Sequence, residues 1–176
     1  MNQPAPRDGH PVWTVYNKLQ SARVNVKYYG RRLQRFEGIS FSIDLLLLAT
    51  APSSAIAGLW FWNTEYGQDV WQWMGALAAL AAVTKPLLGL TKRIKDYENL
   101  LSGYRMLEYD LMEIRSSIQH KQKYDQALQS EFKRVTQREK VLIARNPESR
   151  ESRRTKLKCE IEVLRDLQSN PFFIPN

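Results

Sequence analysis

The sequence predicts an all-α membrane protein, in which an antiparallel two-span transmembrane hairpin (residues 39–90) precedes a long cytoplasmic helical coiled-coil hairpin (residues 91–168). Two apolar runs, at residues 39–62 and 70–90, are each long enough to cross a bilayer, whose hydrocarbon core needs about 20 apolar residues. The short segment NTEYGQD joins them, so the runs should return on each other. The rest of the chain lacks the alternating, turn-punctuated pattern of strands.

Two other interpretations of the apolar runs are weaker. Buried core helices of soluble proteins are usually shorter and less continuously apolar. The segment GRRLQRF, followed by an apolar run and Ala55-Ile56-Ala57, faintly resembles a twin-arginine signal with its cleavage site. However, the run continues as GLWFW and a second run follows it at once. We therefore expect two membrane spans.

The segments outside the hairpin have distinct compositions. Residues 1–12 hold three prolines and no apolar period, which is typical of a disordered lead-in. Residues 13–38 interleave apolar and basic side chains at three- and four-residue steps, which predicts an amphipathic helix beside the membrane. Residues 169–176 (SNPFFIPN) form a C-terminal tail suited to docking on a partner or on the other helices.

The charge distribution predicts the orientation of the hairpin. Basic residues crowd before the first span and after the second, whereas the connecting loop carries only Glu65 and Asp69. Loops rich in Lys and Arg stay in the cytoplasm, so both termini should be cytoplasmic at the inner (plasma) membrane. The basic residues expected to face anionic lipid are Arg31, Arg32, Arg35, Lys92, Arg93 and Lys95. Interfacial tryptophans expected near the loop are Trp60, Trp62, Trp71 and Trp73.

Two ionisable residues, Asp44 and Lys85, lie inside the predicted spans at matched depth from the inner end. Charges at membrane depth generally face protein or water. One hypothesis is therefore an Asp44–Lys85 ion pair, or a polar ring at the inner mouth of an oligomeric pore. The alternative is that Lys85 extends to the inner interface and keeps Asp44 hydrated. Pro86 can kink the second span, which makes a bend there a candidate gate.

Small residues recur at four- and then three-residue steps in both runs. They are Ala51, Ala55 and Gly58 in the first run and Gly75, Ala79 and Ala82 in the second. Small residues allow helices to approach closely in membranes. These positions serve either contacts between copies in a homo-oligomer or only the seam within one hairpin.

Residues 91–146 predict one long amphipathic helix of coiled-coil character, continuous with the second span and ended by Asn146-Pro147. Its apolar seam is Ile94, Tyr97, Leu101, Tyr104, Leu107, Leu111, Ile114, Ile118, Leu128, Phe132, Val135 and Leu142, with interruptions near Lys121 and Asp125. Residues 147–168 restart a helix that should fold back on the first. Its apolar side is predicted at Leu157, Ile161, Leu164 and Leu167.

Motifs of catalysis are absent from the sequence: there is no phosphate-binding glycine loop, no GxSxG and no HExxH. Cys159 is the only cysteine and lies on an apolar stripe, so it is expected to be a core residue. The net charge of +8 would suit nucleic acid in a soluble chain, but beside membrane spans lipid is the simpler partner. We expect no enzyme, cofactor, metal or nucleic-acid partner.

Three segments, YYGRRLQRF, WFWNTEYGQDVWQWM and KRIKDYENLLSGYRMLEYDL, resemble the SLATT proteins. These are two-span effectors associated with SMODS nucleotide synthases and SLOG sensors in bacterial conflict systems. The likeness covers residues 13–145, and the residues that carry it best are Tyr97, Leu100, Tyr104, Leu107 and Leu111. A two-span calcium uniporter subunit shares the topology, but its acidic DIME signature is missing.

The resemblance implies a pore-forming effector of antiviral defence. It would oligomerise and permeabilise the inner membrane, causing abortive infection, when a partner nucleotide synthase or sensor protein signals. The sequence contains no fused nucleotide-sensing domain, so the trigger should act on the cytoplasmic helices or come from a separate protein. The alternative function is a membrane-anchored helical scaffold or interaction subunit without a pore.

Overall fold

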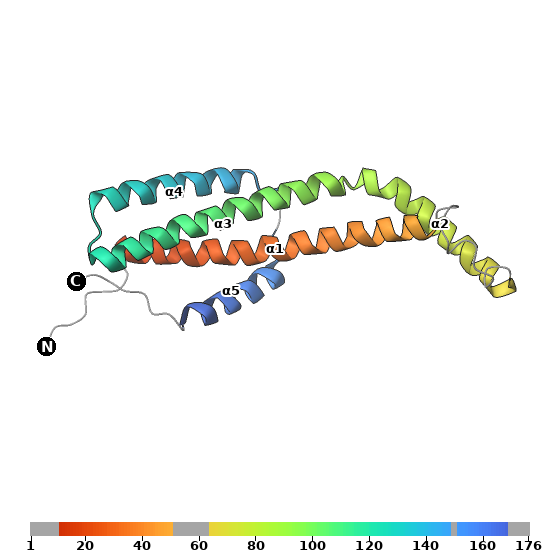
Figure 1. Cartoon of the computed structure of the whole chain (residues 1–176), viewed down its shortest axis with the longest axis horizontal. Helices are drawn as coiled ribbons and strands as arrows, with labels where there is room; N and C mark the ends of the chain where they lie inside the picture. The colour runs from red at the N-terminus through yellow and green to blue at the C-terminus, as the bar shows by residue number, and fades with distance from the viewer. Residues whose placement is uncertain (1–10, 51–63, 149–150, 169–176) are drawn as a thin grey trace. The chain divides into compact units, whose positions relative to one another are not determined.

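The structure, a computed structural model, describes residues 11–50, 64–148 and 151–168 (Figure 1). Within these residues it contains five α-helices and no strand, which confirms the all-α class. The helices are α1 (Pro11–Ala49), α2 (Glu65–Leu87), α3 (Leu90–Lys121), α4 (Gln126–Ala144) and α5 (Arg153–Gln168). They divide into two compact units, which are described separately below.

The bundle unit consists of Met1–Arg31 and Asp96–Asn176. In its described part, α4 returns along α3, and α5 lies beside α1 (Figure 1). The predicted seam of α3 and α4 is largely confirmed in its core. Its buried members are Tyr97, Leu101, Tyr104, Leu107, Leu111, Ile114, Ile118, Leu128 and Val135, while Phe132 and Leu142 are half-buried. From α1 the core receives Val12, Val15, Leu19, Ala22, Tyr28 and Tyr29.

A turn at residues 122–125 divides the segment predicted as one helix, so the prediction of a single helix over residues 91–146 was wrong. Gln122 takes a left-handed conformation (φ 48°), which ends α3. Asp125 then caps α4: its side chain accepts a hydrogen bond of 2.9 Å from the backbone N–H of Leu128. This hydrogen bond is the main reason that the pKa of Asp125 lies below its usual value.

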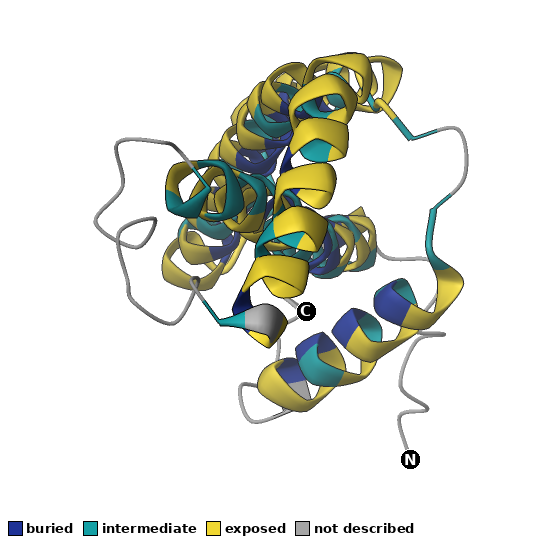
Figure 2. Cartoon of the chain, turned by 90° about the vertical axis from the view of Figure 1, so that its right-hand side faces the viewer, coloured by how far each residue is buried: buried dark blue, intermediate teal, exposed yellow. Residues whose placement is uncertain are grey.

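The buried face of α5 differs from the predicted one. Thr155, Cys159, Val163 and Leu167 are buried, whereas Leu157, Ile161 and Leu164 are exposed. Of the predicted apolar side, only Leu167 enters the core. Cys159 is fully buried, as expected of a core residue. Figure 2 shows this one-sided burial of α5.

The second compact unit, Arg32–Lys95, is called the apolar unit here. Its first helix is the end of α1, which runs without a break across the boundary predicted between residues 38 and 39. Thr64 caps α2 by accepting a hydrogen bond of 3.1 Å from Gly67 N–H. Consequently the predicted loop is helical from Glu65 onwards.

The end of α2 lies at Leu87, one residue after Pro86, and Gly89 has a positive φ of 56°. This left-handed conformation favours glycine and separates α2 from α3. The predicted continuity between the second span and the following helix was therefore wrong. By length and composition, none of the described helices passes alone as a membrane span; the pair Tyr66–Leu87 and Leu90–Lys121, bent by 50°, passes together. The end of the predicted first span, residues 51–62, lies outside the described residues.

Candidate functional site

The apolar unit brings together the two ionisable residues singled out in the sequence. Lys85 Nζ on α2 contacts Asp44 Oδ1 on α1 as an ion pair. The Asp44 side chain is 54% exposed and that of Lys85 is 26% exposed. The ion pair therefore lies at the surface of the chain, where water, lipid headgroups or another copy could contact it. A polar ring at a pore mouth stays a prediction.

Both helices of the apolar unit expose large apolar side chains. On α1 they are Ile39, Phe41, Leu45 and Leu48. On α2 and just after it they are Tyr66, Val70, Trp73, Leu77, Leu80, Val83, Leu87 and Leu88. Soluble monomers rarely expose contiguous apolar patches beyond a few hundred Å². This surface therefore favours contact with lipid or protein over contact with water.

The small residues of α2 are also exposed. Gly75, Ala79 and Ala82 face outward, and a methyl group added at Gly75 would meet nothing within 4 Å. The inward face of α2 is instead centred on Ala78, which is 7% exposed. Trp71 is half-buried and Trp73 is exposed. The predicted residues Ala51, Ala55, Gly58, Trp60 and Trp62 lie outside the described residues.

The juxtamembrane basic residues divide into two groups. Arg31 is engaged within the bundle unit: its guanidinium group donates a 2.5 Å hydrogen bond to Glu162 on α5 and lies 3.4 Å from Cys159 Sγ. Its contact with lipid stays a prediction. The hydrogen bond with Glu162 raises the pKa of Arg31. Arg32 lies over the ring of Phe36, 5.5 Å from its centroid. The remaining four, Arg35, Lys92, Arg93 and Lys95, are exposed.

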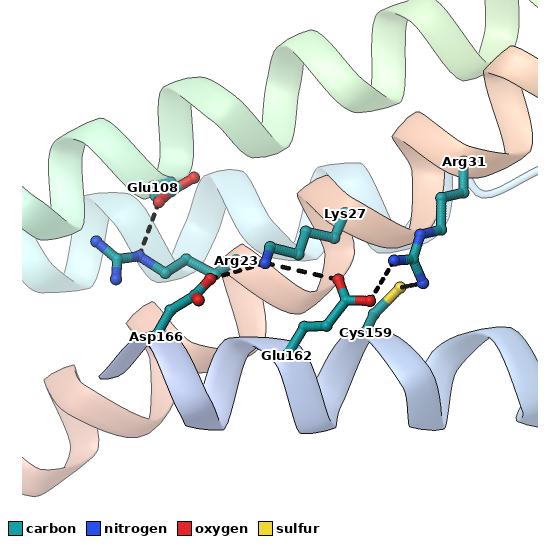
Figure 3. A network of polar contacts seen from close by, with 7 residues as sticks. All are labelled: Arg23, Lys27, Arg31, Glu108, Cys159, Glu162 and Asp166. Carbon is teal, nitrogen blue, oxygen red and sulfur yellow. Dashed lines mark hydrogen bonds and ion pairs between the residues drawn. The ribbon is translucent and has the colours of Figure 1, made fainter. Parts of the chain in front are cut away.

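Arg31 belongs to a basic stripe on α1 that pairs within the bundle unit (Figure 3). Arg23 donates to Glu108 on α3 at 2.8 Å. Lys27 contacts Asp166 at 2.7 Å and Glu162 at 3.7 Å, both on α5. Hydrogen bonds from Arg31 and Lys27 lower the pKa values of Glu162 and Asp166 respectively. These contacts give α5 its orientation on α1.

A tyrosine cluster that the sequence did not predict as a site holds the segment between α4 and α5. The hydroxyls of Tyr28 and Tyr97 each donate a 2.5 Å hydrogen bond to one carboxylate oxygen of Glu148. The Tyr28 hydroxyl also accepts a hydrogen bond of 2.9 Å from Ser152 N–H. Glu148 follows Pro147 in a connection without helical periodicity, so no local pattern pointed to this role.

Behind this cluster the ring of Tyr29 stacks on Tyr104, with centroids 5.3 Å apart. Burial raises the pKa of Tyr104 to about 12 and raises that of Tyr29 as well. Both rings are buried, so the pair is a packing element of the core.

Among the described residues, no group of His, Cys, Asp and Glu side chains is arranged to hold a metal ion. The α3–α4 groove contains an open cavity of about 170 Å³, lined by charged residues of both signs, including the 2.5 Å ion pair between Arg138 and Asp110. Comparison of the chain with family models, curated proteins and solved structures finds no match. The resemblance to SLATT proteins therefore stays a prediction.

Proposed function

We propose that the chain is a two-span inner-membrane effector of a bacterial anti-phage system that signals with nucleotides, and that its copies assemble into a pore. The observation that carries this proposal is the exposed apolar surface of the apolar unit. A helix that is apolar on nearly every side needs lipid or protein around it. The resemblance of residues 13–145 to SLATT proteins supports the same function.

Exposed small residues on α2 support assembly of several copies. Gly75, Ala79 and Ala82 are not used by the inward face of their own helix. In membranes such small-residue faces let two helices approach closely, where dispersion contacts stabilise association. We place these residues at contacts between copies, with the Asp44–Lys85 pair near the cytoplasmic side of the pore.

The proposed orientation puts both termini in the cytoplasm and the turn between the spans outside. Its support is the positive charge at one end of the apolar unit, where Arg35, Lys92, Arg93 and Lys95 are exposed. Anionic headgroups of the inner leaflet are the partner that these cations fit. The bundle unit would then face the cytoplasm, where a nucleotide synthase or sensor protein acts.

A membrane-anchored scaffold without a pore is the second candidate. It is favoured by one observation: the bundle unit is well packed and carries an unused apolar stripe on α5, as a docking module would. In this function the apolar unit only tethers the bundle unit to the bilayer.

Replacing residues 39–90 with an unrelated two-span anchor separates the two functions. The proposed pore predicts that growth arrest, induced by expression with the neighbouring genes, disappears in the replaced chain. The scaffold predicts that growth arrest is retained. The matched control replaces only Gly38 with Ala, an exposed position where a Cβ meets nothing within 4 Å. Membrane fractionation of both variants checks that each is inserted.

A further inference from the structure

The outer side of α5 carries an apolar stripe that nothing in the described part of the chain covers. Leu157, Ile161 and Leu164 are 57%, 51% and 42% exposed. Their spacing of four and three residues places them along one line of the helix. The opposite side of α5 is occupied by its contact with the bundle core, so this stripe is a second, separate apolar face.

One flank of this stripe is strongly basic. At 100° per residue, Arg154, Lys158 and Arg165 project beside the stripe, and Arg153 precedes it. All four are exposed, and none forms an ion pair with another residue that the structure describes. The acidic residues Glu162 and Asp166, by contrast, are engaged with α1. The flank formed by Arg154, Lys158 and Arg165 therefore presents cations to a partner, whereas the other flank carries Glu160.

On its other flank the stripe borders an open cavity of about 230 Å³ between α1 and α5. Its lining includes Leu164 and Glu160 from α5 and Val24, Gln20 and Ser21 from α1. A cavity of this kind beside an apolar ridge accepts a protruding side chain of a partner helix, because ridges pack into grooves.

The narrowness of the stripe favours a helix over a lipid surface as its occupant. A helix that inserts into the headgroup layer uses a broad apolar face with Trp, Phe or Leu. Here the bundle already occupies one side of α5, and three aliphatic residues in a 4–3 spacing remain. That spacing is the seam by which two helices pack together.

Charge argues against a second copy packed antiparallel as the occupant. Two α5 stripes packed antiparallel would bring Lys158 and Arg165 of one copy against the same cations of the other, which is repulsive. A partner with carboxylates beside its own apolar seam is attracted instead.

We propose that the outer face of α5, formed by Leu157, Ile161, Leu164 and the flanking cations, is the docking site for an acidic amphipathic helix of a partner protein. The inference concerns the bundle unit and does not depend on a pore. If the proposed function holds, this face is where a separate triggering protein engages the effector.

The test uses the full chain, purified in zwitterionic detergent, and two labelled helical peptides of about three heptads. Both peptides carry Ile and Leu at the seam; one has Glu at the flanking positions and the other Lys. Fluorescence anisotropy measures binding at low and high salt. We expect the Glu peptide to bind at least about tenfold more tightly than the Lys peptide, with affinity falling as salt rises.

Single substitutions then locate the binding surface. Ile161→Lys should weaken binding of the Glu peptide at least about tenfold, as at a central anchor of an interface. Ile143→Lys is the matched control, because Ile143 on α4 is 58% exposed, and it should leave binding unchanged. Circular dichroism checks that both variants stay helical.

Four outcomes would overturn the proposal. Equal binding of the two peptides would show that charge does not select the partner, and equal loss in the two variants would show that α5 is not the site. A change in oligomeric state caused only by Ile161→Lys would assign the stripe to a second copy. Protection of α5 from hydrogen exchange by anionic vesicles, but not by the Glu peptide, would assign it to lipid.

Discussion

Lys85 on α2 forms an ion pair with Asp44 on α1, 41 positions earlier in the sequence. Both helices also expose large apolar residues, among them Phe41 and Leu48 on α1 and Val83 and Leu87 on α2. In the proposed membrane hairpin, the loss of one charge would leave the other uncompensated in apolar surroundings. The pair therefore gives the apolar unit a polar feature that substitution can test.

Reversing the two charges tests whether the pair itself matters. Asp44→Lys and Lys85→Asp each place like charges together and should reduce growth arrest at least about tenfold, whereas the double reversal should restore it. Lys133→Asp on α4 is the control, because Lys133 is exposed and forms no ion pair with another residue that the structure describes. If the double reversal caused as little growth arrest as the single ones, contact between Asp44 and Lys85 would not explain the defect of the single variants.

Gly75→Leu should disrupt assembly without unfolding the chain. A Cβ at Gly75 meets nothing within 4 Å in the described part of its own chain, so we expect the added bulk to act on a neighbouring copy. Crosslinking in membranes should show loss of the oligomer. Gly38→Leu, at a similarly open glycine on α1, should assemble normally. Normal assembly of the Gly75 variant would show that the small residues of α2 do not form the contact between copies.

Gly103 on α3 permits the close approach of Leu142 from α4, whose side chain a Cβ at Gly103 would overlap. Gly103→Ala should gain helix propensity of about 1 kcal/mol but lose at least as much to overpacking. In a Leu142→Ala background the overlap disappears, so the same substitution should stabilise the chain by about 1 kcal/mol relative to that background. Chemical unfolding of the four chains measures this cycle; additive effects would contradict the contact.

Stability of the bundle unit should fall above about pH 10, the usual pKa of tyrosine. Burial raises the pKa of Tyr104 to about 12, and the negative charges of Glu139 and Glu151 raise it in the same direction. Between pH 10 and 12 the unfolded chain loses a proton that the folded chain keeps, so the free energy of unfolding falls by at most about 1.4 kcal/mol per pH unit.

Tyr104→Phe isolates this effect from the deprotonation of lysines in the same range. The variant should lose stability less steeply than the parent between pH 10 and 12, as followed by chemical unfolding at several pH values. If the free energy of unfolding fell equally steeply with pH in the two chains, the pKa of Tyr104 would be the same in the folded and unfolded states, which would contradict the prediction.

The sequence predicts the parts of the fold that depend on local periodicity. The seam of α3 and α4 follows from apolar residues three and four apart, and residues from Tyr97 to Val135 are buried accordingly. The turn at residues 122–125 showed in the sequence only as an interruption of that pattern. No glycine marks it, because the left-handed position is taken by Gln122.

Long-range contacts explain the rest. Ion pairs of Glu162 and Asp166 with Lys27 and Arg31 flank the buried side of α5, and no local pattern encodes these contacts. The pairing of Arg31 with Glu162 could not be predicted for the same reason, and contact of Arg31 with anionic lipid stays a prediction. The matched depth of Asp44 and Lys85, in contrast, could be counted from the ends of the apolar runs, and the structure brings these two residues together.

The central claim, a pore in the inner membrane, is tested most directly by measuring the membrane potential of cells that express the chain with its neighbouring genes during phage infection. The account predicts that the potential collapses and that a membrane-impermeant dye enters, and that Lys85→Asp prevents both. An intact potential in growth-arrested cells would contradict it.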